Sequence, residues 1–384
     1  PASLEAVDHA MDNTCNPVQK QTAASVHCDG RQAPAESGKT IFDYADNLAV
    51  RVPTSCGRNG SCHECIVDIK RGTDALSAKT DYEAFLTENY RLACQARVID
   101  AQQDIEFSLL RRTPKILPGQ SQKTIDLDPM VTRRGDHVFY GDEQIDRYRG
   151  SIHGMAIDVG TTTVVFELID LESGESLYCS AFENPQRFGG SDVMNRISYD
   201  GGKYHGELHR AMINTLNTEV RSMCRELSIS RHTIYELVMV ANSTMRELFF
   251  NLDVQPIGQK PYKSPIEEQY LAGERDTTAL TAMAKSLSLL LNPQARVYGA
   301  PLIASHVGAD VTADLLAIDM PSQTDVVMLV DAGTNTEVVI GHKDRLIAAS
   351  CPAGPAFEGG LITFGMPGCD GAIESFKYDN GDWQ

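Results

Sequence analysis

The chain has 384 residues, of which 42% are hydrophobic, enough for two or three globular domains and too many for a disordered protein. Its net charge of −18 argues against a nucleic-acid partner, because nucleic-acid-binding proteins neutralise phosphates with Lys and Arg. No apolar run is long enough to cross a bilayer, and the polar start PASLEAVDHAMDN does not resemble a secretory signal, so we expect a soluble cytoplasmic protein with no membrane partner.

The pattern changes three times along the chain. Residues 1–23 lack periodicity and are expected to be a tail, whereas residues 24–112 contain short β-like segments and one helix. Residues 113–152 begin with the polar, Pro-containing stretch TPKILPGQSQK and are expected to form a linker or small middle segment, with few contacts between the domains on either side. In residues 153–384, the strand-like runs MAI, VVFELI, ELVMV and VVMLV alternate with helical stretches, which predicts an α/β domain.

Four cysteines are closely spaced. Cys56, Cys62 and Cys65 form a C-x5-C-x2-C pattern in a glycine-containing loop, and Cys94 follows in the segment RLACQ. Four thiolates can bind an iron–sulfur cluster or a zinc ion. Structural zinc sites favour two C-x2-C pairs, and the second pair is missing here, so the spacing favours a cluster. A Rieske centre would need two histidines, and His63 alone is nearby.

Two further patterns in this region, and the remaining cysteines, have simpler interpretations. The Ser37–Thr40 segment resembles the end of a phosphate-binding loop, but Ala33 replaces the first glycine, so we expect a turn between two strands. The Thr80–Glu83 segment predicts a capping box that opens a helix leading to Cys94. We expect the other cysteines to be reduced and mostly buried. They are Cys15, Cys28, Cys179, Cys224, Cys351 and Cys369.

A strand–turn–strand pattern, D-x-G-T-x-T, occurs twice in the α/β region. The first copy comprises Asp158, Gly160, Thr161, Thr162 and Thr163, and the second comprises Asp331, Gly333, Thr334, Asn335 and Thr336. Glycine lets the backbone approach an anion, and backbone N–H groups with Thr hydroxyls form a phosphate cradle. Each Asp can hold Mg²⁺ beside the phosphates. Two facing copies would bind the phosphates of a nucleotide from both sides. The alternative is that both hairpins are purely structural.

Between the two copies lies an amphipathic helix in the segment ELHRAMINTLNTEVRSMCREL. Its apolar residues recur every three or four positions, which predicts a helix with one face in the hydrophobic core. They are Leu208, Met212, Leu216, Val220, Met223 and Leu227.

Both motif groups resemble known families. The cysteine segment resembles [2Fe–2S] ferredoxins with adrenodoxin-like spacing, which implies an α+β β-grasp fold, one-electron transfer and the four clustered cysteines as ligands. The hairpins resemble the phosphate-binding motifs of the actin and sugar kinase superfamily. This second resemblance implies an actin-like, RNase H-like α/β ATPase domain that binds ATP with Mg²⁺, with Asp158 and Asp331 as its catalytic carboxylates.

A ferredoxin joined to such an ATPase resembles the reductive activators of corrinoid enzymes. The segments FENPQ at 182–186, ANSTM at 241–245, VGAD at 307–310 and AGPAFEG at 353–359 are also similar to that family. The resemblance implies ATP-dependent reduction of Co(II) to Co(I) in a corrinoid protein or corrinoid-dependent methyltransferase, and an upstream electron donor. It also implies that Gly354 and Glu358 help to bind the nucleotide.

The chain departs from the family pattern in two places. Residues 113–152 are shorter than the middle domain that the family often carries, although a homodimer remains an expectation. The chain ends soon after the second hairpin, which predicts a truncated form with a partly built nucleotide site. Two other functions stay open: a simple electron-transfer ferredoxin for an oxygenase or reductase, and a nucleotide-regulated binding protein whose cluster senses redox state.

Overall fold

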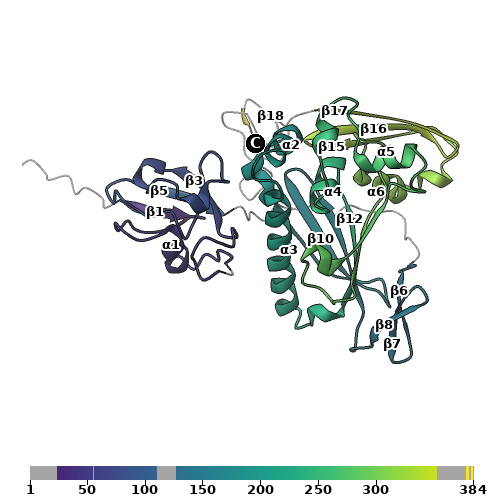
Figure 1. Ribbon diagram of the computed structural model, residues 1–384, viewed down its shortest axis with the longest axis horizontal. Coiled ribbons are helices and arrows are strands. Elements are labelled where there is room, and N and C mark those ends of the chain that lie inside the picture. Colours follow the sequence, from purple (N-terminus) through teal and green to yellow (C-terminus); the bar gives the residue numbers. More distant parts are fainter. Residues whose placement is uncertain (1–23, 55, 110–126, 353–377, 380–381, 384) are drawn as a thin grey trace, which may run out of the picture.

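The computed structural model describes residues 24–54, 56–109, 127–352, 378–379 and 382–383, so the predicted tail lies outside the described residues. The N-terminal unit contains a five-stranded sheet in the order β2-β1-β5-β3-β4 (Figure 1). Its strands are β1 (Ser25–Cys28), β2 (Arg31–Pro34), β3 (Ile66–Arg71), β4 (Tyr90–Leu92) and β5 (Ile105–Leu109). β1 and β5 run parallel, and the other pairs are antiparallel. Helix α1 (Ile41–Asn47) buries Ile41, Phe42 and Tyr44 in the core, which completes the expected β-grasp fold.

The Ser37–Thr40 segment corrects one prediction, because it joins β2 to α1 rather than to another strand. Thr40 caps the helix: its Oγ1 accepts a hydrogen bond from the backbone N–H of Asp43 at 3.1 Å. The Asp43 carboxylate in turn accepts one from the backbone N–H of Thr40 at 2.8 Å. The Thr-x-x-Asp spacing was therefore a helix start, and the resemblance to a phosphate-binding loop concealed it.

The Thr80–Glu83 segment corrects a second prediction. Its capping contact is present, with Glu83 accepting from the backbone N–H of Thr80 at 2.9 Å, but it opens only the short 3-10 helix η2 (Asp81–Glu83). A second 3-10 turn, η1 (Thr73–Ala75), precedes it. Fully buried Glu83 also accepts hydrogen bonds from Arg91 Nε at 2.7 Å and from the backbone N–H of Leu92 at 3.0 Å. Glu83 thus anchors β4, the strand directly before Cys94.

The second unit is built on a six-stranded mixed sheet in the order β11-β10-β9-β12-β14-β13. Its strands are β9 (His153–Val159), β10 (Thr163–Asp170), β11 (Ser176–Glu183), β12 (Ile234–Val240), β13 (Leu280–Met283) and β14 (Arg296–Gly299). β9, β12 and β14 run parallel, whereas β10 and β11 form antiparallel hairpins beside β9. The predicted strands MAI, VVFELI and ELVMV lie in β9, β10 and β12.

The predicted amphipathic helix is α3 (Glu207–Glu226), which runs along this sheet (Figure 1). Leu208, Met212, Leu216 and Met223 have no exposed surface, and they share one hydrophobic cluster with Leu237 of β12. The periodicity therefore identified the buried face, although the helix ends one residue before Leu227. The other helices of this region are α2 (Val193–Asp200), α4 (Ser243–Phe249) and α5 (Pro265–Leu271), with the 3-10 turns η3 (Pro185–Gly189), η4 (Arg231–Thr233), η5 (Gln255–Gly258) and η6 (Ala284–Leu287).

A three-stranded antiparallel sheet follows, in the order β15-β16-β17. Its strands are β15 (Val327–Ala332), β16 (Asn335–His342) and β17 (Arg345–Pro352). Helix α6 (Ala309–Ala317) packs on one face, where Val311 joins Leu329 and Val339, and the 3-10 turn η7 (Met320–Ser322) leads into the sheet. Near the end of the chain, β18 (Tyr378–Asp379) pairs with β19 (Asp382–Trp383). The predicted VVMLV strand lies in β15.

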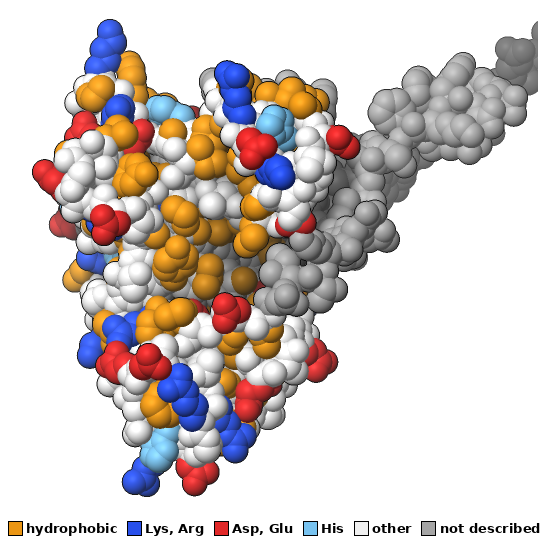
Figure 2. Space-filling model, turned by 90° about the vertical axis from the view of Figure 1, so that its right-hand side faces the viewer, with side chains coloured by type: hydrophobic (Ala, Val, Ile, Leu, Met, Phe, Trp, Pro, Cys, Tyr) orange, Lys and Arg blue, Asp and Glu red, His pale blue; other side chains and the backbone are white. Residues whose placement is uncertain are grey.

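The segment between the two units contains a small meander of β6 (Val131–Arg134), β7 (His137–Tyr140) and β8 (Glu143–Arg147). Asp146 fixes it to the six-stranded sheet by accepting hydrogen bonds from Tyr235 at 3.0 Å and Asn292 at 2.9 Å. Figure 2 shows the side of the molecule at the right of Figure 1, where apolar side chains gather across the middle and charged ones lie above and below. Within the described residues, no helix has the length and apolar character of a membrane span.

Candidate functional site

The four clustered cysteines lie on the loop between α1 and β3 and immediately after β4. Cys65 Sγ and Cys94 Sγ are 3.4 Å apart, and both residues are buried. Thr54 Oγ1 lies 3.9 Å from Cys56 Sγ and 4.0 Å from Cys62 Sγ. The structure thus brings the four thiols together as two pairs, Cys56 with Cys62 and Cys65 with Cys94.

The loop stabilises negative charge on Cys56. Burial by itself raises the pKa of this thiol, but hydrogen bonds from Cys62 and from the backbone N–H groups of Asn59 and Gly60 outweigh burial and lower the pKa to about 6. Several donors directed at one sulfur favour the thiolate, the form that binds metals. The loop therefore offers a metal ligand that is already largely ionised at neutral pH.

A hydrogen bond joins the thiols of the second pair, Cys65 and Cys94. A hydrogen bond from Cys65 lowers the pKa of Cys94 to about 7, and the same hydrogen bond, together with burial, raises the pKa of Cys65. The loop geometry depends on Gly60, whose φ is +92° and whose position would place a Cβ atom 2.9 Å from the Tyr82 ring. Glycine is needed at this turn because no other residue avoids both the strained conformation and the clash.

This donor set fits a [2Fe–2S] cluster better than a single zinc ion. In the part of the chain that the structure describes, no three His, Cys, Asp or Glu side chains converge as ligands of one metal ion. A structural zinc site needs four donors around one centre, whereas a [2Fe–2S] cluster is ligated at two irons. Cys56 and Cys62 would hold one iron, and Cys65 and Cys94 the other.

The first phosphate-type hairpin joins β9 to β10, and three side chains hold its turn. Asn184 Nδ2 donates to the Gly160 carbonyl at 2.7 Å, and Arg196 Nη2 donates to the Thr161 carbonyl at 2.6 Å. Asn242 Nδ2 donates to Thr161 Oγ1 at 3.0 Å. Arg196 has no exposed surface, so its guanidinium is fixed in the core beneath the turn. The turn is therefore held by two fully buried donors, Asn184 and Arg196, and by half-buried Asn242.

The second hairpin joins β15 to β16 and meets the first. Thr162 Oγ1 and Thr334 Oγ1 lie 3.3 Å apart, within hydrogen-bond distance. The two turns are not equivalent, because a Cβ atom at Gly160 would lie 2.6 Å from the Thr163 carbonyl, whereas one at Gly333 would have no contact closer than 3.4 Å. We call the two turns together the hairpin site. Of its predicted residues, Thr163 begins β10, and Asn335 and Thr336 begin β16.

Five carboxylates gather at the hairpin site. Burial, together with the charges of Asp310, Asp331 and Asp314, raises the pKa of Asp158 to about 7. Burial is also the main cause that raises the pKa of Asp310 and Asp314 to about 6 and that of Glu337 to about 7, and it raises the pKa of Asp331. Clustered carboxylates disfavour each other's ionisation unless a cation compensates them. The predicted pair, Asp158 and Asp331, therefore lies within a larger acidic group.

Asp158 is open to water, and the pKa of its carboxyl group is strongly raised. Its residue surface is exposed, yet protein atoms surround its carboxylate at longer range and reduce its solvation. The neighbouring carboxylates act over that longer range, so the pKa is raised although the residue is open to water. A carboxylate that is accessible but costly to ionise is suited to binding a divalent cation.

Sequence reasoning missed several residues of this site. Asp314 and Glu337 were not predicted, and Asp310 entered only as part of a family-like segment. The detectable signal was the spacing of Asp310 and Asp314, which puts them on one side of α6. Arg196 was also missed, since nothing in its local sequence shows that it reaches the first hairpin. The predicted Gly354 and Glu358 lie outside the described residues.

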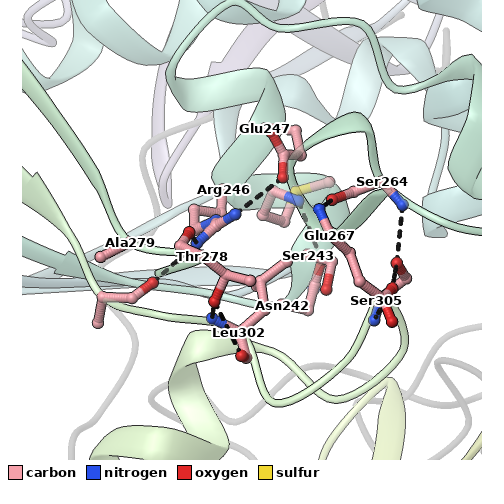
Figure 3. A network of polar contacts seen from close by, with 12 residues as sticks. Asn242, Ser243, Arg246, Glu247, Ser264, Glu267, Thr278, Ala279, Leu302 and Ser305 are labelled. Atoms are coloured by element: carbon pink, nitrogen blue, oxygen red, sulfur yellow. Dashed lines mark hydrogen bonds and ion pairs between the residues drawn. The ribbon is translucent and has the colours of Figure 1, made fainter. Parts of the chain in front are cut away.

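A polar network extends from Asn242, which contacts the first hairpin, along α4 (Figure 3). Asn242, which contacts Thr161, is the N-cap of α4 and accepts from the backbone N–H of Met245 at 3.0 Å. One helical turn later, fully buried Arg246 donates to the carbonyls of Thr278 at 2.7 Å and Ala300 at 2.9 Å. Its other terminal nitrogen lies 2.9 Å from the Glu247 carboxylate, which is also fully buried.

Family comparisons cover nearly all of the described chain. Residues 26–98 match the 2Fe-2S iron–sulfur cluster binding domain, so the predicted class of cluster is confirmed. Residues 153–323 match the RACo middle region, and residues 325–384 match the C-terminal domain of RACo, the ASKHA domain. The order of these matches agrees with the predicted ferredoxin followed by an actin-like domain.

Individual relatives agree with these matches. The corrinoid activation enzyme RamQ of Eubacterium limosum is 29% identical over 383 residues, covering 89% of this chain and 63% of the relative. The [Co(II) methylated amine-specific corrinoid protein] reductase of Methanosarcina barkeri is 27% identical over 244 residues, covering 61% of this chain and 42% of the relative. The chain thus spans less than two thirds of either relative.

A solved structure shows the same fold. The reductive activator for corrinoid, iron–sulfur protein aligns with a TM-score of 0.57 and 24% identity, covering 92% of this chain and 67% of that one. The two RACo matches, which together span more than half of the chain, follow the ferredoxin match and show that the chain belongs to the RACo family.

Proposed function

We propose that this protein reductively activates a corrinoid protein or a corrinoid-dependent methyltransferase, reducing Co(II) to Co(I) at the expense of ATP. One observation carries the proposal: a four-thiol loop suited to a [2Fe–2S] cluster and two facing phosphate-type hairpins occur in one chain, and the ferredoxin-like unit shares one hydrophobic cluster with the six-stranded sheet that carries the first hairpin. The two relatives, a corrinoid activation enzyme and a corrinoid protein reductase, support a corrinoid protein as the substrate.

The cluster would supply a one-electron donor, and the chain would hold it through the two cysteine pairs. At the hairpin site, the backbone and hydroxyl groups of the turns would bind the phosphates of ATP from both sides. Asp158 and Asp331 would hold Mg²⁺ directly or through water, with the phosphates completing its coordination. An upstream electron donor would return the cluster to its reduced form.

A nucleotide is needed because the electron transfer is uphill. Co(I) corrinoids have very low reduction potentials, and for a one-electron couple each ~59 mV of unfavourable gap lowers the reduced fraction tenfold. Binding and hydrolysis of ATP can help to overcome the gap by changing how tightly the activator holds the Co(II) and Co(I) forms of its partner.

The direct experiment follows the Co(II) absorption of a corrinoid protein mixed with the cluster-loaded chain and a reductant, with and without Mg-ATP. We expect Co(II) to disappear faster, and to a greater extent, when ATP is present. Reduction that is equal with and without ATP would favour the simple ferredoxin. Binding without any reduction would favour the redox-sensing protein.

A further inference from the structure

The loop that carries the cysteines also contacts the second unit. His63, which lies between Cys62 and Cys65, places Nδ1 3.0 Å from the carboxylate of Glu207, the first residue of α3. Its ring stacks on Phe85, with the ring centres 4.1 Å apart. The polar linker predicted few contacts between the domains, and this prediction is wrong, because the cluster loop itself is part of the interface.

Phe85 continues the contact toward η3 and α2. Its ring meets the Phe188 ring edge-on at 5.7 Å, and both residues are buried. The Tyr199 hydroxyl donates to the Phe85 carbonyl at 2.5 Å, and Thr87 Oγ1 donates to the Phe188 carbonyl. The segment that stacks on His63 is thus tied to the second unit by two hydrogen bonds and an aromatic contact.

The same elements hold the first phosphate-type hairpin. Asn184 caps η3 by accepting from the backbone N–H of Gln186 at 2.9 Å, while its Nδ2 donates to Gly160. Arg196 of α2 donates to the carbonyls of Gly190 at 3.0 Å and Thr161 at 2.6 Å. An unbroken series of contacts therefore runs from the cysteine loop through Phe85 and η3 to the hairpin.

The interface also contains a small pocket. Its cavity of about 40 Å³ lies between the units along α3. It is lined on one side by Pro53 and Glu64 of the ferredoxin-like unit, and on the other by Asn214 and Thr218 of α3. The units also touch near the other end of α3, where Arg51 Nη1 donates to Ser222 Oγ at 3.2 Å, so contacts between the units flank the pocket on both sides.

We propose that this series of contacts couples the two sites, so that a nucleotide bound at the first hairpin changes the protein environment of the cluster through η3, Phe85 and His63. The inference rests on the proposed nucleotide site and adds a route by which that site regulates the electron donor. Coupling between two sites is reciprocal. Reduction of the cluster must therefore change nucleotide affinity by the same factor by which the nucleotide changes the reduction equilibrium.

Reciprocity gives two independent measurements on the cluster-loaded full chain. Calorimetry measures the affinity for Mg-ATP in the oxidised and in the reduced protein. A redox titration followed by EPR measures the cluster potential with and without Mg-ATP. A tenfold ratio of the two affinities corresponds to a potential shift of ~59 mV, so the two results must agree.

Two conservative variants interrupt the route without removing side-chain volume. Tyr199→Phe deletes the hydrogen bond to the Phe85 carbonyl, and Glu207→Gln weakens the contact with His63. Glu226→Gln is the matched control, since Glu226 is an exposed glutamate at the opposite end of α3. We expect the double variant to bind Mg-ATP and keep its cluster, but to lose most of the affinity ratio, whereas the control keeps it.

The outcomes separate this inference from the proposed function. A wild-type chain that binds Mg-ATP equally in both redox states, or a double variant that keeps the wild-type ratio, overturns the coupling and leaves the nucleotide site intact. A wild-type chain that does not bind Mg-ATP overturns both. If the double variant loses its cluster, each single variant provides the same comparison, because each removes one contact only.

Discussion

The cysteine loop stabilises negative charge on its side chains, whereas the hairpin site disfavours it. In the loop, hydrogen bonds lower the pKa of Cys56 to about 6 and that of Cys94 to about 7. At the hairpin site, burial and mutual repulsion raise the pKa of Asp158 and Glu337 to about 7. One site stabilises anionic ligands before a metal arrives, and the other brings together anions that repel each other.

This difference indicates how each site depends on its ligand. A loop that already favours thiolates should retain a cluster through many rounds of electron transfer. A group of carboxylates without enough donors destabilises the folded chain until a cation neutralises it. Ligand binding should thus alter stability and conformation more at the hairpin site than at the cluster, as expected of a regulatory site.

The largest effect should come from removing a cluster ligand. Cys94→Ser deletes one thiolate of the buried pair, and its neighbour Cys65 is itself a predicted ligand and cannot take its place. We expect the purified variant to lose nearly all of the roughly two irons and two labile sulfides that a [2Fe–2S] chain contains. Cys179→Ser, at an exposed position on β11, is the control and should keep both. Stoichiometric zinc without labile sulfide in the wild type would refute the cluster assignment.

The next effect tests the support beneath the hairpin site. Arg246→Ala removes a fully buried cation and leaves the Glu247 carboxylate and two carbonyls without their partner. We expect a loss of about 3–5 kcal/mol in unfolding free energy, measured by chemical denaturation. The exposed control Arg225→Ala should change it by at most about 0.5 kcal/mol. A loss for Arg246→Ala as small as that of the control would show that the network does not stabilise the second unit.

Sequence patterns predicted features in which neighbouring residues carry the signal. The period of Leu208, Met212 and Leu216 identified the buried face of α3, and the paired D-x-G-T-x-T turns predicted two hairpins that do meet. Long-range partners were not visible. Arg196 reaches the first hairpin from a position 35 residues away, and Glu207 meets His63 from 144 residues away. Such contacts depend on how strands and helices are ordered in space, which local spacing does not encode.

Local sequence patterns gave wrong predictions where one pattern is compatible with two different structures. The Thr80–Glu83 spacing is typical of a helix start, yet the 3-10 turn ends at Glu83, whose buried carboxylate pairs with Arg91. The polar linker suggested independent domains, although the contact surface lies in the cysteine loop, far from the linker in sequence. Tertiary contacts decided both cases.

A smaller effect should follow from neutralising one carboxylate of the hairpin site. Asp158→Asn should weaken Mg-ATP binding at least about tenfold, or 1.4 kcal/mol, because a cation ligand is lost. The same change should stabilise the folded chain in the absence of nucleotide, since it removes repulsion from Asp310 and Asp331. Calorimetry and thermal denaturation measure the two effects, and Asp142→Asn, with a fully exposed side chain, is the control. Weaker binding with lower stability would mean that the variant misfolds.

The smallest predicted effect is the pH dependence of Mg-ATP binding, and its sign follows from the raised pKa values. Asp158 and Glu337 ionise near pH 7 in the folded chain instead of near 3.8 and 4.5, their ordinary values. Their protonated forms therefore favour the folded state, and this stabilisation is lost as the pH rises from about 4 to about 7. Cation binding has the opposite dependence, because protons and Mg²⁺ compete for the same oxygens.

We therefore expect the affinity for Mg-ATP to rise about three- to tenfold between pH 6 and pH 8, while the unliganded chain becomes less stable over the lower part of that range. The phosphates of the nucleotide also titrate near pH 6, so the wild-type curve alone is not sufficient. Glu337→Gln removes one of the carboxylates that titrate in this range and leaves the nucleotide chemistry unchanged. Its curve should be shallower than that of the wild type, because only Asp158, Asp310 and Asp314 then contribute the remaining change. Parallel curves for the two proteins would assign the whole pH dependence to the nucleotide and would contradict a functional role for the raised pKa of Glu337.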